Sequence, residues 1–396
     1  MSLVEKHFLW FLRAGLWGLT RDGSCEALKS AAPSPDEDFD WGGIFSLAKR
    51  QTVLLLVEDG VEAWMQWLRE NEQTIPEIPA IYLLKIENLR DLAREQHAMQ
   101  DKMLQRACGL LQQDGITPYL LKGESLALLY PQPFSRVCGD IDLYVDPEDF
   151  KRAKHLLSSV YDTIGRVTDK HCTFKEGRLK LELHWQAMSL GNPFARKAFQ
   201  TYSRESLSSM QPSRYSLPLS GYQVAVPPLQ FNLIFVLAHL FHHFIEGGVG
   251  LRQLCDWAVL LQHASSETTT VDSALDLSEL KARLEKFSLM RAWKVFGNIA
   301  VRYLGVPVEK MPFYSESCSS SANRCLSIIL TEGNFGRYGK GKYARRKGDS
   351  YSQRKSKALR LTSKRLWRKS IIFPMDVLYY LPTWGAESFS RLFKHQ

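Results

Sequence analysis

The sequence lacks the features that mark several protein classes. Its seven cysteines are widely and irregularly spaced and form no CxxC pair, so it carries no sign of a zinc ribbon, a thioredoxin-type motif or a disulfide framework. No stretch approaches the ~18 apolar residues that a membrane-spanning helix requires, and no internal repeat is visible. We therefore expect a protein of the reducing cytoplasm with no transmembrane segment.

The overall composition is that of a folded globular protein. The 396 residues are 45% hydrophobic and 23% charged, which argues against a disordered or fibrous chain. At about 150 residues per domain, this length predicts two or three folded units. The apolar start of the chain is interrupted by Lys6 and Arg13 and has no clean cleavage site. It therefore predicts an amphipathic helix packed on the body of the protein.

The net charge of +9 is concentrated in one segment. Residues 337–369 contain fourteen basic residues and one acidic residue, so this segment carries +13 and the rest of the chain −4. Tyrosines and Trp367 are interspersed among its cations, a mixture typical of nucleic-acid contacts. Two other interpretations of the segment are a site for an anionic membrane surface and a solvated surface, which is what charge runs usually are.

The hydrophobic periodicity divides the chain into helical ends and a mixed middle. A long helix is predicted from about Ala80 to Gln112 by apolar residues on one face. Strands are predicted near 116–121, 139–145, 170–175 and 178–185, and later helices at 228–246, 250–263, 277–287 and 289–304. We therefore expect an α+β protein with four regions: 1–113 helical, 114–190 the mixed core, 191–310 a helical bundle, and 311–396 a polar loop, the basic segment and a tail.

Two predicted strands carry acidic residues on one face. Because side chains alternate along a strand, Asp140 and Asp142 share a face opposite their apolar neighbours. Glu182 and His184 share the polar face of the strand at 178–185 in the same way. If the strands are neighbours, Asp140, Asp142 and Glu182 can form a three-carboxylate site for Mg²⁺ or Mn²⁺. An exposed acidic strand face is the other interpretation, and His184 is either an acid–base group or a support for Glu182.

Residues before the aspartates indicate a phosphate site. Lys122 and Gly123 stand at a predicted strand-to-helix turn, where free backbone N–H groups can face phosphate. Arg136 lies four residues before Asp140 and could hold a phosphate oxygen.

Two helical patterns in the later part of the chain carry further candidates. His239 shares a helix face with both His242 and His243. This spacing fits a metal-ligand pair, buried histidines of the bundle, or residues that line the cleft and contact substrate. Arg252 and Asp256 lie four residues apart, so they are predicted to form an ion pair, with a phosphate contact as the alternative for Arg252.

Together these pieces resemble the nucleotidyltransferase superfamily typified by DNA polymerase beta. The resemblance is closest to a poorly characterised bacterial branch in which an LKG motif precedes R…DIDL. It rests on Leu121-Lys122-Gly123, Leu126-Ala127, Tyr130-Pro131, Arg136, Gly139 to Leu143, Glu182 to Trp185, Gly250 to Arg252 and Asp256-Trp257. It covers roughly residues 40–310, with its core at 116–186.

The resemblance implies a fold and a reaction. The fold would be a small mixed-sheet core between N-terminal helices and a C-terminal helical bundle. The reaction would be a Mg²⁺-dependent transfer of a nucleoside monophosphate from an NTP to an acceptor hydroxyl, releasing pyrophosphate. By motif position, Asp140, Asp142 and Glu182 would ligate the metal, and Glu182 would help to deprotonate the acceptor. The turn with Gly123 and its neighbours Lys122 and Ser125 would receive the triphosphate.

One position departs from the pattern of that superfamily. A Gly-Gly or Gly-Ser pair is usual in the phosphate turn, whereas this chain has Gly123-Glu124-Ser125. A glutamate facing a triphosphate would repel it, so Glu124 must point away or the phosphate site is altered. The alternative function is therefore a non-catalytic protein that binds nucleotide or nucleic acid through residues 337–369. Neither the donor NTP nor the acceptor is specified by the sequence.

Overall fold

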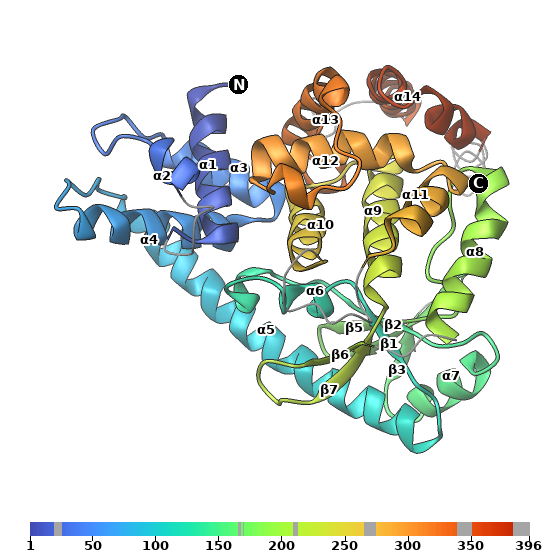
Figure 1. Ribbon diagram of the computed structural model, residues 1–396. Helices are drawn as coiled ribbons and strands as arrows, with labels where there is room; N and C mark the ends of the chain where they lie inside the picture. The colour runs from blue at the N-terminus through green and yellow to red at the C-terminus, as the bar shows by residue number, and fades with distance from the viewer. Residues whose placement is uncertain are drawn as a thin grey trace.

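A mixed β-sheet lies between helices on both of its faces (Figure 1). The computed structural model describes residues 1–19, 26–164, 168, 170–208, 213–264, 275–338 and 351–382. The helices longer than one turn are α1 (Leu3–Trp17), α2 (Glu26–Ser30), α3 (Trp41–Gln51), α4 (Leu54–Glu70), α5 (Ala80–Gln113), α7 (Phe150–Ser158), α8 (Pro193–Ser208), α9 (Leu229–Glu246), α10 (Leu251–Ala264), α11 (Leu277–Lys286), α12 (Met290–Leu304), α13 (Ser319–Glu332) and α14 (Tyr351–Ser370). The short α6 (Glu124–Ala127) follows the first strand.

The sheet has the strand order β3-β4-β5-β2-β1-β7-β6. Its strands are β1 (Tyr119–Leu121), β2 (Ile141–Tyr144), β3 (Asp162–Ile164), β4 (His171–Glu176), β5 (Leu179–His184), β6 (Ser213–Ser216) and β7 (Gln223–Val226). The central strand β2 pairs antiparallel with β1 and parallel with β5. The α+β class and the mixed sheet predicted from the sequence are therefore confirmed.

The two faces of the sheet belong to different cores. Ile141 and Leu143 of β2 and Leu181 of β5 are buried with apolar residues of α5 and α7. Tyr144 and Leu121 point to the other face and belong to the core that includes α9, α10 and α12. The predicted alternation along β2 is thus confirmed, and it turns the acidic side chains toward the helical bundle.

The sheet extends beyond the predicted core region of 114–190. Both β6 and β7 come from later residues, and β7 joins the sheet because Ala225 pairs in parallel with Tyr119. The sequence gives a weak signal here, since β6 has an alternating half-buried pattern and carries little apolar surface.

Glycine allows two N-terminal helices to touch through their backbones. A Cβ atom on Gly15 of α1 would collide with the carbonyl oxygen of Leu56 in α4, and one on Gly60 would collide with that of Phe11. The first of these helices is the one predicted at the start of the chain, and its N-terminus is closed by a capping box between Ser2 and Glu5. The close crossing packs α1 tightly onto α4.

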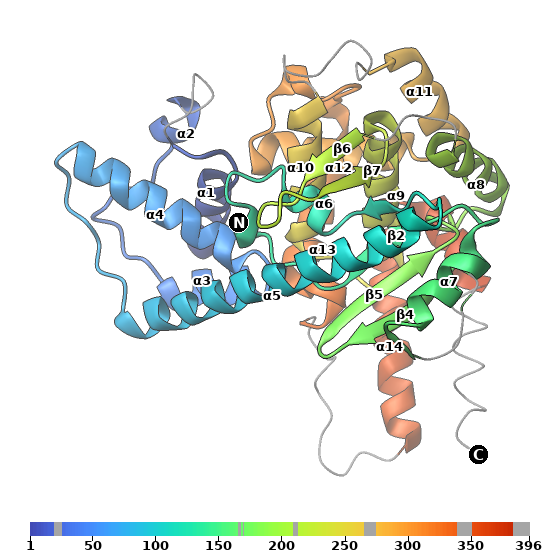
Figure 2. The same ribbon diagram turned by 90° about the horizontal axis from the view of Figure 1, so that it is seen from below.

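The 34-residue helix α5 connects this N-terminal group to the sheet, which it crosses in Figure 2. Near its start, Arg90 forms ion pairs with Glu58 and Asp59 of α4. In its second half, Asp101 accepts hydrogen bonds from the backbone and hydroxyl of Ser220 in the β6–β7 turn. The predicted long helix is confirmed. It contacts α4 in its first half and the β6–β7 turn in its second half.

The basic segment at 337–369 is only partly described. Six of its charged residues, from Lys340 to Asp349, lie outside the described residues. In α14, Arg365 pairs with Glu332, and the buried Lys369 donates to the carbonyl of Ile245, so these two cations hold the helix against the bundle. Lys364 and Arg360 are exposed.

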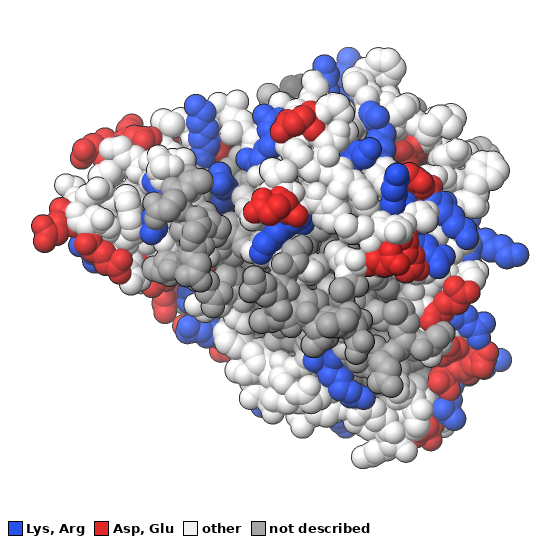
Figure 3. All heavy atoms as spheres, viewed as in Figure 1, with Lys and Arg blue, Asp and Glu red and all other residues white. Residues whose placement is uncertain are grey.

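On the described part of the face shown in Figure 3, acidic and basic side chains are interspersed. None of the helices in the described ranges combines the length and apolarity needed to cross a bilayer.

Candidate active site

Two of the three predicted acidic residues, Asp142 and Glu182, stand side by side at the centre of the sheet. Asp142 lies in β2 directly opposite Glu182 of β5, so the prediction that these strands are neighbours is confirmed. Because the two residues are paired in a parallel ladder, their side chains leave the same face of the sheet. Asp140 stands just before the first residue of β2 and is exposed. This places Asp142 and Glu182 side by side, with Asp140 at the start of the same strand.

Asp142 is buried and is surrounded by positive partners. Its Oδ2 lies 3.2 Å from Nζ of Lys122, and its Oδ1 lies 2.9 Å from Nε2 of His184. Burial by itself would raise the pKa of Asp142, but the Lys122 ammonium and the hydrogen bond from His184 hold the pKa well below its ordinary value. Asp142 is therefore an ionised carboxylate, and His184 donates to it through Nε2.

Two histidines surround Glu182. Its Oε2 lies 3.4 Å from Nε2 of His184 and 3.7 Å from Nε2 of His171. The hydrogen bond with His184 lowers the pKa of Glu182 against the opposing effect of burial. Burial would lower the pKa of His184, but its bonds to Asp142 and Glu182 raise it overall. His184 thus supports both carboxylates, which is one of the two roles predicted for it.

His171 also belongs to this group, although its sequence position did not predict it. It lies in β4, where it pairs with His184 across the antiparallel hairpin, and burial lowers its pKa. The tight Glu176-Gly177 turn fixes this register, because each step back from the turn on one strand matches one step forward on the other. Counting residues from that turn would have placed His171 opposite His184.

Asp140 has a different environment from its neighbour. Although its side chain is exposed, partial desolvation by the surrounding protein and the negative charge of Asp142 raise its pKa. Its backbone carbonyl lies 3.5 Å from the place where a Cβ atom on Gly123 would stand. The phosphate-type turn and the start of β2 are therefore in direct proximity.

The Lys122-Gly123 turn is confirmed as a strand-to-helix connection. It joins β1 to α6 with a φ of +48° at Lys122 and +49° at Gly123. A positive φ is uncommon for a residue with a side chain, so Lys122 is held in this conformation by its surroundings. The hydroxyl of Ser125 donates to the carbonyl of Lys122 and closes the turn. Within the described contacts, Ser125 thus shapes the turn, and its predicted contact with nucleotide remains a prediction.

Glu124 points away from the carboxylate group. Its side chain is buried, and its Oε2 lies 2.9 Å from Nδ1 of His97 in α5. The sequence left two possibilities, that Glu124 points away from the phosphate site or that the site is altered. The structure shows that Glu124 points away, because it bonds to His97 whereas the Lys122 side chain contacts Asp142. The unusual Gly123-Glu124-Ser125 turn is therefore compatible with an anionic ligand near Lys122.

The bundle contributes histidines to the same site. Nε2 of His239 in α9 lies 3.2 Å from Nζ of Lys122, and Nε2 of His243 lies 3.1 Å from Nε2 of His239. Burial and the charge of Lys122 lower the pKa of His239 well below its usual range and that of His243 to about 4. Among the described residues, no group of three close metal-ligand side chains includes His239. The structure instead places it as a neutral neighbour of Lys122.

Arg136 and Arg252 do not join the carboxylates. The buried Arg136 donates to both oxygens of Asp256 at 3.0 and 2.7 Å, and Tyr130 also donates to that carboxylate. Arg252 donates to the carbonyl of Val137. The predicted Arg252–Asp256 pair is therefore wrong, because Asp256 is taken by residues more than a hundred positions away. The structure gives Arg136 a buried structural contact in place of the predicted phosphate contact.

The protein family described as "Uncharacterised nucleotidyltransferase" matches residues 37–305. The chain belongs to this family. This match confirms the resemblance inferred from the LKG and DIDL motifs and supports the transferase class.

A crystal structure of an antigenic nucleotidyltransferase-like protein from Paracoccidioides brasiliensis is similar over 48% of this chain and 90% of that chain, with 15% identity and a TM-score of 0.30. No curated protein matches the sequence.

The donor atoms at the site suit a hard divalent cation. The carboxylates of Asp142 and Glu182 are adjacent, both have lowered pKa values, and both are therefore in the charged form that a metal ion requires. Oxygen ligands of this kind are those that Mg²⁺ and Mn²⁺ prefer. The residues present thus fit the metal that the family resemblance implies.

Proposed function

We propose that this protein transfers a nucleoside monophosphate from an NTP to an acceptor hydroxyl and releases pyrophosphate. The observation that carries the proposal is the in-register pair of Asp142 and Glu182, with the ammonium of Lys122 3.2 Å from Asp142. A carboxylate pair with an adjacent cation is suited to bind a metal–triphosphate complex, which brings both charge signs. Membership of a nucleotidyltransferase family supports the same reaction class.

In this proposal, Asp140, Asp142 and Glu182 hold Mg²⁺ or Mn²⁺. The bound cation would neutralise charge on the phosphates during transfer. Lys122 lies at the edge of this group and would contact a phosphate oxygen as a point charge. The turn at Gly123 leaves room for the backbone to approach the ligand, because no side chain projects from it.

In the proposed reaction, one bond to the α-phosphorus forms as another breaks. The acceptor oxygen forms a bond to the α-phosphorus while the bond from that phosphorus to the bridging oxygen of the β-phosphate breaks. Pyrophosphate leaves with the bonding electron pair, and the hydroxyl proton passes to Glu182. The side chain of Glu182 is 23% exposed, compared with 7% for Asp142, so it is the more accessible of the two to an incoming acceptor. His184 orients Glu182 and Asp142 together.

A screen of NTPs with Mg²⁺ or Mn²⁺ tests the proposal by measuring pyrophosphate release and labelling of candidate acceptors. Asp140→Ala and Asp142→Asn should each abolish metal-dependent NTP binding and turnover with the fold retained by circular dichroism. Asp162→Asn, on the edge strand β3, is the matched control and should retain activity. Unchanged pyrophosphate release in Asp142→Asn would overturn the site assignment.

The second function is nucleic-acid binding through the basic segment, and the observation that favours it is the exposed position of Arg360 and Lys364 on α14. Binding to RNA or DNA should then fall steeply with salt and weaken when both residues are changed to glutamine. The buried His97–Glu124 contact removes the argument that the phosphate turn itself is repulsive. Salt-independent binding, or binding unaffected by the two changes, would exclude this function for α14.

A further inference from the structure

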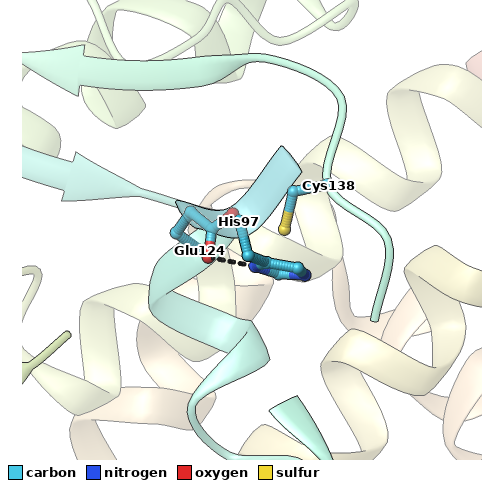
Figure 4. Close-up of side chains that lie close together, drawn as sticks. All are labelled: His97, Glu124 and Cys138. Atoms are coloured by element: carbon cyan, nitrogen blue, oxygen red, sulfur yellow. Dashed lines mark hydrogen bonds and ion pairs between the residues drawn. The ribbon is translucent and has the colours of Figure 1, made fainter. Parts of the chain in front are cut away.

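Three potential metal ligands meet in the protein interior behind the Lys122-Gly123 turn. They are His97 from α5, Glu124 at the start of α6 and Cys138 from the segment that leads into β2 (Figure 4). All three are buried, with exposed fractions of 3%, 4% and 2%. One ligand atom from each lies within 4.8 Å of the other two.

Two atoms of this group are buried without a partner. Among the described residues, neither Nε2 of His97 nor Oε1 of Glu124 has a hydrogen-bond partner, although the same two side chains share one bond through Nδ1 and Oε2. Leaving a buried polar atom without a hydrogen-bond partner destabilises the folded protein, and more so when the group is charged. The interaction between His97 and Glu124 therefore leaves binding capacity unused in a dry environment, which indicates that a further ligand belongs here.

We propose that His97, Glu124 and Cys138 bind a structural Zn²⁺ ion. Imidazole nitrogen, carboxylate oxygen and thiolate sulfur are the three ligand types that zinc accepts, at about 2.0–2.3 Å. The sulfur ligand separates this site from the all-oxygen site of Asp142 and Glu182, because thiolates favour zinc over magnesium. With Cys138 and Glu124 ionised and His97 neutral, the bound cation gives a site of zero net charge, which suits its burial.

Cys138 has a fixed cationic donor beside its sulfur, although burial raises the pKa of its thiol overall, so the bound metal would have to displace the thiol proton. Nη1 of Arg136 donates to Sγ of Cys138 at 2.9 Å, and Arg136 is itself fixed by Asp256. A donor to the sulfur stabilises its anionic form, and such contacts around the ligands orient them and tune the metal. Gln96 of α5 donates to the backbone carbonyl of Cys138 and fixes the segment. Gln100, one turn after His97, has an Oε1 atom that is buried without a partner among the described residues, so this atom or a water molecule would supply the fourth position.

The zinc ion would connect α5 to both segments that carry the candidate active-site residues. Glu124 follows Lys122 by two residues, and Cys138 precedes Asp140 by two residues. Fixing Glu124 and Cys138 to the same ion would set the separation between the Lys122 turn and the start of β2. This role is structural and holds whether or not the nucleotidyl-transfer reaction is the one proposed above.

Metal analysis of the full chain tests the proposal. Protein purified without chelator should contain one zinc ion per chain, and Co²⁺ exchanged into the site should show a sulfur-to-metal charge-transfer band. Cys138→Ser should lose that band, whereas Cys172→Ser, which removes a buried cysteine of β4, should retain it. Retention of the band in Cys138→Ser would overturn the proposal.

A second measurement does not depend on a folded variant. The cluster of His171, Glu182 and His184 also has three ligand atoms within 4.8 Å of one another, but it contains no sulfur. Cobalt bound only there would give no charge-transfer band, so a full chain that binds Co²⁺ without this band overturns the proposal, as does a full chain that binds no zinc. Chelator should also lower the melting temperature of the wild-type chain, and an unchanged melting temperature would contradict a structural ion.

Discussion

The ammonium of Lys122 lies 3.2 Å from Oδ2 of Asp142 and 3.2 Å from Nε2 of His239. One side chain therefore connects the carboxylates of the sheet to helix α9 of the bundle. Lys122 itself stands in the turn between β1 and α6 with a positive φ. The ammonium is thereby fixed beside the candidate metal site.

Removing the Lys122 ammonium should strongly slow the proposed reaction. In Lys122→Met, we expect kcat/KM for NTP to fall by about 10²-fold or more, because a preorganised cation near the phosphates is lost. Lys122→Arg keeps the charge and should recover part of the rate. The steady-state release of pyrophosphate measures both, with Lys197→Met on the exposed surface of α8 as control. Equal kcat/KM in wild type and Lys122→Met would contradict the assigned role.

The buried Arg136–Asp256 pair should be essential for stability. Asp256→Ala leaves the Arg136 guanidinium buried without its two acceptors, which typically costs about 3–5 kcal/mol of unfolding free energy. For comparison, Glu279→Gln breaks the partly exposed pair with Arg283 and should cost under about 1 kcal/mol. Urea unfolding measures both changes. Similar losses for the two variants would show that the buried pair is not the stabilising element.

The backbone crossing of α1 and α4 should reject even one methyl group. Gly60→Ala places a Cβ against the carbonyl of Phe11 and should destabilise the protein by about 1–3 kcal/mol. Gly109→Ala is the matched control, because a Cβ there meets nothing within 4 Å. In a helix this second change should stabilise by about 0.5–1 kcal/mol. Thermal unfolding that moves in the same direction for both variants would contradict the close crossing.

The histidines of α9 should make the fold sensitive to acid. Burial lowers the pKa values of His242 and His243 to about 4, below the value of about 6.5 expected in the unfolded chain. The unfolded chain therefore binds protons first as pH falls from about 6.5 to 4. Unfolding free energy should decrease in that window by about 1.4 kcal/mol per pH unit for each such histidine.

His243→Gln provides the test of this slope. Urea unfolding between pH 7 and pH 4 should show a shallower loss of stability in this variant than in the wild type. His155→Gln changes an exposed histidine of α7 and should leave the slope unaltered. An identical slope in His243→Gln and wild type would show that His243 does not remain neutral in the fold.

Periodicity predicted the parts of the site that lie along single strands. Asp142 and Glu182 each stand at polar positions between apolar neighbours, so their faces followed from alternation alone. Their pairing with each other was an assumption that only the ladder between β2 and β5 confirms. Placing His171 at the site requires the register of the β4–β5 hairpin. The Glu176-Gly177 turn sets that register, and local alternation does not reveal it.

Contacts between distant segments were beyond local patterns. Arg136 and Asp256 are separated by 120 positions, and the nearer Arg252 was the better partner by helical spacing. Likewise, the cluster of His97, Glu124 and Cys138 joins three segments, none of which carries a metal-binding motif of its own. Chain-wide packing, not spacing, decides such pairs.

The family match begins after α1 and ends before α13, but both helices are integral to the packing. Trp17 of α1 donates to the carbonyl of Leu304 in α12, and Gln51 of α3 donates to the carbonyl of Ile329 in α13. A fragment trimmed to 37–305 would therefore expose the apolar surfaces that these helices cover. The residues that the family model matches are fewer than those whose helices pack together, so a truncated form of this protein should keep α1 and α13.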